Sequence, residues 1–166
     1  MNVVTFVLPF VWGAAASFCY ALIFNADFKG LLWTPFVGAF GWGLYMLLST
    51  LTGSAATAYF AASFCVAAFS ELCAVLSRTP ATVFLIPGLI PLVPGGGMFQ
   101  TMRAFVQGDP DTAARIGFTT LSAAGAIVLG IAISSSCAHI VFVLIKNAKV
   151  RKAKRETLRG HADKYR

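Results

Sequence analysis

Long apolar stretches dominate the chain, and polar residues are confined to the short segments between them. Three stretches are long enough, at about 20 residues, to cross a bilayer as helices. We predict these spans at residues 3–24, 33–51 and 55–76. A fourth apolar segment covers 81–94 and continues amphipathically to residue 106, and a last one covers 116–145. The pattern predicts an all-α polytopic membrane protein with about five membrane elements.

The composition of the chain leads to the same class of protein. Apolar residues make up 58% of the 166 residues and charged residues 11%, against roughly 45–50% and about 25% in soluble domains. A chain of this size lacks the polar surface needed to cover so many apolar side chains in water. The first apolar run is also too long for the hydrophobic region of a signal peptide, so we expect it to be retained.

Charge is distributed unevenly, with a formal net charge of +7. Most basic residues follow the last span, namely Lys146, Lys149, Arg151, Lys152, Lys154, Arg155, Arg159, Lys164 and Arg166. Because Lys/Arg-rich segments stay cytoplasmic, we predict a membrane transport module at 1–145 and a basic cytoplasmic tail at 146–166. Five crossings place the N-terminus outside, whereas a re-entrant fourth element would place it inside. The tail lacks aromatic interleaving, so we expect it to attract anionic lipid and not nucleic acid.

The fourth segment is interrupted by Pro87, Pro91 and Pro94 and then by Gly95–Gly97. A proline lacks a backbone N–H and collides with the carbonyl four residues earlier, so the helix should kink and unwind by Pro94. Unwound backbone at membrane depth is tolerated only where it is buried in protein or lines a watery cavity. We therefore predict a cavity at the break and a new helix from about Gly97, with free N–H groups pointing into that cavity.

Transporters with discontinuous helices place such half-helix ends at the substrate. We assign substrate binding, with the carboxylate at the broken helix, to Pro91, Pro94, Gly95, Gly96, Gly97 and Arg103. Arg103 either attracts an anionic substrate or reaches the outer interface. The alternatives to a substrate site are a kinked structural helix and a re-entrant loop that shapes an interface.

Ionisable residues inside the predicted spans are costly and usually face a partner or a pathway. Glu71 is such a residue, and Arg78 follows it on nearly the same helical face. The two form either a structural ion pair or an ion-coupling and substrate site. His139, near the end of the last span, is either an ion-coupling or a packing residue. We expect Asp109 to cap the last helix, together with Asp111.

Helix packing has its own signature in the last span, where small residues recur at every fourth position: Ser122, Ala126, Gly130, Ser134 and Ala138. Small residues on one face let another helix approach closely in lipid, and Gly38 with Gly41 has the same character. The four cysteines, Cys19, Cys65, Cys73 and Cys137, all lie in apolar spans. We expect them to be buried small hydrophobic residues. No metal-ligand spacing, nucleotide-binding motif or catalytic motif is present, so we predict no metal, no cofactor and no enzymatic activity.

The string TPATVFLIPGLIPLVPGGGMFQTM, with the preceding ELCAVLSR and the early IFNADFKGLLW, resembles the small second-half module of the threonine/serine exporter family. That family carries a proline at the start of the fourth element and a P-x-x-P-G signature, matched here by Pro80 and by Pro91, Pro94 and Gly95. The resemblance covers roughly residues 3–145. It implies a bacterial inner-membrane exporter of small amino or carboxylic acids, either threonine/serine-like or dicarboxylate.

The resemblance also implies a partner, because family members carry both modules in one chain or in two subunits. This chain matches only the second module, so the resemblance implies a larger subunit that carries the first. A homo-oligomer is a further arrangement that the small-residue faces allow. The alternative function is that of a non-transporting structural partner that stabilises another membrane protein.

Overall fold

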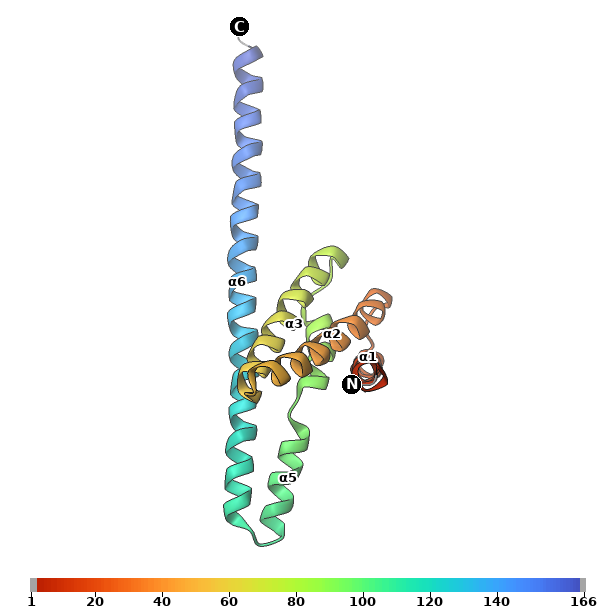
Figure 1. Cartoon of the computed structure of the whole chain (residues 1–166). Helices are drawn as coiled ribbons and strands as arrows, with labels where there is room; N and C mark the ends of the chain where they lie inside the picture. The colour runs from red at the N-terminus through yellow and green to blue at the C-terminus, as the bar shows by residue number, and fades with distance from the viewer. Residues whose placement is uncertain (1–2, 165–166) are drawn as a thin grey trace.

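The computed structural model describes residues 3–164, with side chains described for residues 7–142, and every regular element in that part is helical (Figure 1). The elements are α1 (Val3–Ile23), α2 (Phe28–Thr52), α3 (Ala55–Ser77), α4 (Thr82–Leu89), the 3-10 turn η1 (Ile90–Leu92), α5 (Gly95–Val106) and α6 (Pro110–Lys164). The predicted all-α polytopic fold is confirmed. The side chains of the basic segment 146–166 lie outside the described residues.

The helices agree with the predicted membrane elements in number and order. Three of them, α2, α3 and the 110–142 part of α6, are long and apolar enough to cross a membrane. The bent pair formed by α4–η1 and α5 makes a fourth candidate span, and the described side chains of α1 make a shorter apolar helix at Val7–Ile23. Two helices begin earlier than predicted, α2 at Phe28 and α6 at Pro110.

The early start of α6 follows from its N-terminal cap. The backbone N–H of Thr112 donates to Asp109 Oδ1 at 3.0 Å, and Pro110 occupies the first helical position, where no N–H is needed. Asp111 lies in the first turn, where a negative charge interacts favourably with the helix dipole. The predicted cap at Asp109 is confirmed.

A bundle of α1, α2, α3 and α4 packs beside the middle of α6 (Figure 1). Its core contains Val37, Val66, Phe84 and Leu92, all of them fully or almost fully buried. The helices approach closely where glycines remove the side chain. A Cβ at Gly41, for example, would lie 2.5 Å from Val66 Cγ2, so α2 and α3 meet here with little room to spare.

The helix α6 contacts the bundle mainly through α3. A Cβ at Gly130 would collide with Ser63 Oγ and would lie only 2.6 Å from the carbonyl oxygen of Phe60. In the small-residue strip, Gly130 and Ser134 are buried, Ala126 and Ala138 are half-buried, and Ser122 is exposed. Each step of four residues turns about 40° beyond a full helical turn, so a strip with this spacing drifts away from the contact face.

The fourth membrane element is broken at Val93 and Pro94, where the axis bends by 47° between α4–η1 and α5. The new helix begins at Gly95, two residues before the predicted start, because the N–H of Met98 already bonds to the carbonyl of Pro94 (3.2 Å). A bend of 47° is far from a reversal of direction, so α5 runs onward from α4 (Figure 1). This direction fits a broken span and not a re-entrant hairpin.

Two loops lie at the same end of the bundle, as alternate crossings require. Lys29 Nζ, in the first turn of α2, donates to the carbonyl oxygen of Ser77 at the end of α3 (3.3 Å). This bond joins the α1–α2 connection to the α3–α4 connection. The two connections carry Lys29 and Arg78, which we predict to lie on the cytoplasmic side.

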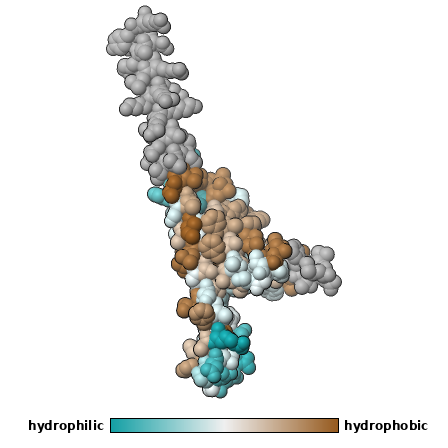
Figure 2. Space-filling view, turned by 60° about the vertical axis from the view of Figure 1, so that its left-hand side comes forward, coloured by the Kyte–Doolittle hydropathy of each residue, from teal (hydrophilic) through white to brown (hydrophobic). Residues whose placement is uncertain are grey.

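The helices α5 and α6 form a hairpin that extends beyond the bundle (Figure 1). Gly108, with φ of 79°, turns the chain between them. Figure 2 shows hydrophilic residues gathered at this turn and hydrophobic residues over the middle of the molecule. The hairpin therefore has an apolar body and a polar tip, as expected for a structure that ends at a membrane surface.

The cysteines differ from the expectation in their burial. Cys73 is buried and Cys65 is half-buried, but Cys19 and Cys137 are exposed. The expectation is wrong for these two, because an apolar span buries only the face that contacts its neighbours in the chain, and the other face is left for lipid or another subunit.

Candidate functional site

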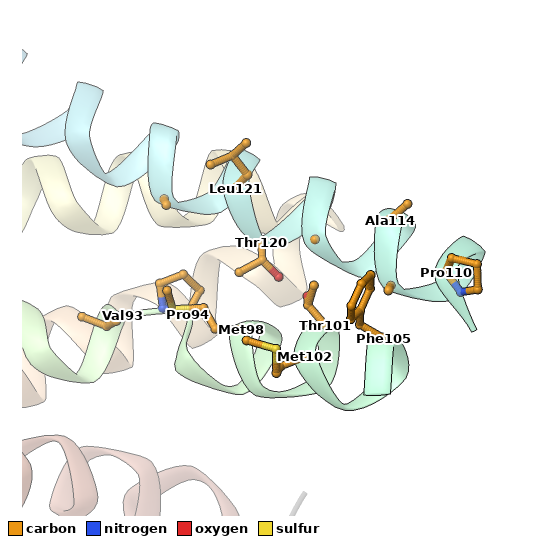
Figure 3. A pocket seen from close by; sticks show the side chains of 13 residues that line it. Val93, Pro94, Met98, Thr101, Met102, Phe105, Pro110, Ala114, Thr120 and Leu121 are labelled. Carbon is orange, nitrogen blue, oxygen red and sulfur yellow. The ribbon is translucent and has the colours of Figure 1, made fainter. Parts of the chain in front are cut away.

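A cavity of about 740 Å³ lies between α5 and the first part of α6, beginning at the break in the fourth element (Figure 3). Its walls include Val93, Pro94, Met98, Thr101, Met102, Phe105, Ala114, Gly117, Thr120 and Leu121. The prolines and glycines of the sequence predict a cavity at this position. The structure shows that α5 and α6 form most of it, with the break at one end.

The wall of this cavity is largely apolar. Its side-chain hydroxyls, at Thr101 and Thr120, donate to carbonyls of their own helices, at Gly97 (2.8 Å) and Ile116 (2.7 Å) respectively. No charged side chain belongs to the wall in the described part of the chain. The side chains of the cavity therefore suit the apolar part of a solute, and a carboxylate would need donors from the backbone.

Free backbone donors lie next to the cavity, in the first turn of α5, but Gly95, Gly96 and Gly97 are not among the residues that line its wall. The N–H of Gly95 bonds to the carbonyl of Val93 (2.7 Å). The next two N–H groups, of Gly96 and Gly97, precede the first intrahelical bond and have no acceptor within the helix. At Gly95 and Gly96 a Cβ would meet nothing within 4 Å. An anion can therefore approach the positive end of the helix without steric hindrance from this chain.

Contacts between α5 and α6 hold this helix end in place. A Cβ at Gly97 would collide with Thr120 Oγ1 and would lie 3.1 Å from Thr120 Cγ2. One turn along, a Cβ at Gly117 would lie 3.2 Å from Thr101 Cγ2. The two helices thus alternate glycine and threonine across their contact, which fixes the position of the α5 N-terminus.

The structure does not bring all the predicted substrate residues together. Pro94 lies in the cavity wall, whereas Pro91 is half-buried in η1. Arg103 is exposed and is not in the wall. It lies eight residues beyond Gly95, or about 12 Å along the helix axis. Of its two predicted roles, this position favours the outer interface.

The predicted ion-coupling residues lie elsewhere. Glu71 is half-buried in α3 and His139 is exposed on α6, and neither borders the cavity. No ion pair joins Glu71 to Arg78 among the residues that the structure describes. The reason is that Arg78 has left the helix, with φ of 58° in the left-handed region, so the expected shared helical face no longer exists.

A second, smaller cavity was not predicted from the sequence. It has a volume of about 260 Å³ and lies between the α1–α2 connection and α4. The connection contributes Phe24, Asn25, Ala26 and Asp27, and α4 contributes Thr82, Val83, Ile86 and Pro87. These residues come from IFNADFKGLLW and TPATVFLIPG, two of the segments that carry the family resemblance. Both segments lie at the same end of the predicted topology, and this shared position is the feature of the sequence that could have indicated a cavity between them.

Comparison with known proteins adds one positive result. The family model described as "Threonine/Serine exporter, ThrE" matches residues 9–137. Neither a curated protein nor a solved structure matches the chain. The matched region begins in α1, ends in α6 and contains the broken span and both cavities. A transporter family agrees with the prediction of a transport role and not a catalytic one. The match over most of its length shows that this multi-pass membrane protein belongs to the threonine/serine exporter ThrE family.

Proposed function

We propose that this chain is the small subunit of a secondary exporter that moves small amino or carboxylic acids out across the bacterial inner membrane. The candidate substrates are threonine, serine and dicarboxylates such as succinate. The residues after the last span lie in the cytoplasm, as the distribution of basic residues favours. The observation that carries the proposal is the broken fourth span, which lies inside the matched family region.

The first turn of α5 binds the substrate carboxylate. Its N–H groups at Gly96 and Gly97 and its positive dipole end are the donors that discontinuous helices offer to anionic groups in other transporters. Hydrogen bonds to a charged group contribute about 1.5–3 kcal/mol each. The neighbouring apolar cavity then accommodates the rest of the solute, beside Met98 and Thr101.

A larger subunit completes the site. In this chain the space beside Gly95 and Gly96 is open, so the chain by itself encloses little of a bound solute. The apolar side chains of α5 are also exposed, at 60% to 79% of their surface, namely Met98, Phe99, Met102, Phe105 and Val106. A partner that packs on this face would enclose the substrate and exclude lipid. Glu71 and His139 stay the predicted ion-coupling residues.

The test is the export of labelled threonine, serine and succinate from cells that lack their own exporters. The chain is expressed alone and with the larger subunit, and the key variant is Gly95→Leu. A leucine side chain fits the open space in this chain but covers the approach to the helix end. If the leucine side chain keeps the carboxylate from one of its charge-assisted hydrogen bonds, transport efficiency should decrease by about 10- to 100-fold at equal membrane abundance.

The matched control is Gly125→Leu, because Gly125 is also exposed in a helix and a Cβ there also meets nothing within 4 Å. This variant should export normally. Normal export by Gly95→Leu would show that the proline-glycine segment serves packing alone. Loss of the larger subunit from the membrane, with unchanged transport by each complex that remains, would favour a structural partner.

A further inference from the structure

The smaller cavity has the dimensions and the location of a site for a small solute. Its volume of about 260 Å³ is just below the roughly 300–1,000 Å³ of pockets for drug-sized ligands. It lies at the start of α4, at the end of the fourth element opposite the break. The two cavities therefore share one helical element, with Pro87 in one wall and Pro94 in the other.

The wall of the smaller cavity carries a negative charge. Asp27 is its charged residue, and Asn25 and Thr82 contribute an amide and a hydroxyl. Asp27 occupies the N-cap position of α2, yet its carboxylate makes no capping hydrogen bond. The nearby ammonium of Lys29 bonds instead to the carbonyl of Ser77 (3.3 Å). No ion pair neutralises Asp27 among the described residues, so its carboxylate is available to a cation.

The backbone around this carboxylate is well anchored. The chain leaves α1 through Asn25, whose φ is 49°, and the N–H of Asn25 bonds to the carbonyl of Leu22 (3.0 Å). The N–H of Ala26 bonds to the carbonyl of Ala21 (3.0 Å). A Cβ at Gly30 would lie 2.9 Å from Val83 Cγ1, so the first turn of α2 packs tightly on α4. Both walls of the cavity are thus fixed relative to each other.

We propose that this cavity binds the ammonium group of an amino acid substrate on the Asp27 carboxylate, with Asn25 and Thr82 as further hydrogen-bonding groups. This inference rests on the proposed function and adds a second site to it. Pro87 and Gly95 are eight residues apart, or about 12 Å along a helix. That separation is too long for one small amino acid to bridge, so the solute occupies Asp27 first and the α5 terminus afterwards.

The two cavities share no wall residue in this structure and lie at opposite ends of the fourth element. The side chains of Phe84 and Leu92 are buried at 0% and 1% exposure, in contact with the core around Val37 and Val66. The cavity at Asp27 therefore binds solute from one side of the membrane only. On the topology predicted from basic residues, that side is the cytoplasm, where an exporter collects its substrate.

The experiment measures the KM for labelled threonine and for labelled succinate in everted membrane vesicles that contain this chain and its larger subunit. Asp27→Asn keeps the shape of the side chain and removes its charge. We expect the KM for threonine to rise by about tenfold or more, whereas transport of succinate, which has no ammonium group, should not fall. Asp111→Asn, at an exposed acidic residue in α6, is the matched control and should change neither.

A second variant, Thr82→Lys, places a positive charge in the same wall and should also raise the KM for threonine. Threonine transport unchanged in both variants would overturn the assignment and leave the proposed function intact. Equal losses for threonine and succinate would also overturn it, because they would indicate a general role in folding or transport. If the unmodified complex transports neither acid, the proposed function itself is wrong.

Discussion

The contact between α3 and α6 gives the most direct test of the fold, and Gly130→Ala is the perturbation. Gly130 lies where α6 crosses α3, and a Cβ there would be 2.6 Å from the carbonyl oxygen of Phe60 and 3.1 Å from the amide nitrogen of Phe64. These are backbone atoms of a neighbouring helix, which cannot rotate away as a flexible side chain does. The added methyl must therefore push the two helices apart.

The size of this displacement follows from ordinary contact distances. Non-bonded heavy atoms prefer about 3.5 Å or more, so the helices must separate locally by about 0.9 Å. A gap of 0.5–1 Å already removes about a quarter to a half of the dispersion energy of each contact. Overpacking of this kind typically costs about 1–3 kcal/mol. An alanine in a helix recovers about 1 kcal/mol relative to glycine, so the net loss is smaller than the packing term.

Gly125→Ala separates the two terms, because Gly125 lies in the same helix and a Cβ there meets nothing within 4 Å. Unfolding in mixed detergent micelles, followed by circular dichroism, gives the free energy of unfolding of each variant. We expect Gly125→Ala to be as stable as the unmodified chain or more stable, and Gly130→Ala to lie about 1–3 kcal/mol below Gly125→Ala. Equal stability of the two variants would refute the packing of α6 on α3.

Two further predictions concern the α5–α6 hairpin. Gly97→Ala should destabilise the hairpin by about 1–2 kcal/mol. Adding Thr120→Ala should remove most of that loss in a double-mutant cycle, because the atoms that the new Cβ meets belong to the Thr120 side chain. Strictly additive effects of the two substitutions would contradict this contact. The hydrogen bond from Thr112 lowers the pKa of Asp109 below its ordinary value. Because the folded-state pKa is the lower one, the cap stabilises α6 above the unfolded pKa and is lost as the pH falls through the folded value. An NMR titration of the Thr112 amide should show its midpoint below about pH 3.9, and a midpoint at or above that pH would contradict the cap.

The features that could be predicted from the sequence are those set by short stretches of chain. Apolar length predicts the membrane elements, and proline chemistry predicts the break before α5. The pattern from Asp109 to Thr112 predicts the start of α6, since a cap needs only residues three positions apart. For such features the physical cause and its effect lie within one or two helical turns.

The features that could not be predicted depend on segments far apart in the chain. The smaller cavity is formed between residues 24–27 and residues 82–87. The pattern of apolar residues in one of these segments does not indicate that it lies next to the other. The relation of Glu71 to Arg78 was misjudged because the helix ends between them in a left-handed residue. Likewise, helical spacing places Arg103 on α5 but does not tell how far the cavity extends along that helix.

The helix α6 continues without interruption from Pro110 to Lys164, which is 55 residues and therefore about 83 Å. A bilayer core is only about 30 Å thick, so more than half of this rod stands outside the hydrocarbon. Its contact with α3 at Gly130 lies about 51 Å from the Lys164 end. A rotation of about 10° at that contact would displace the Lys164 end by about 9 Å, so the length of the helix magnifies any change of its angle to α3.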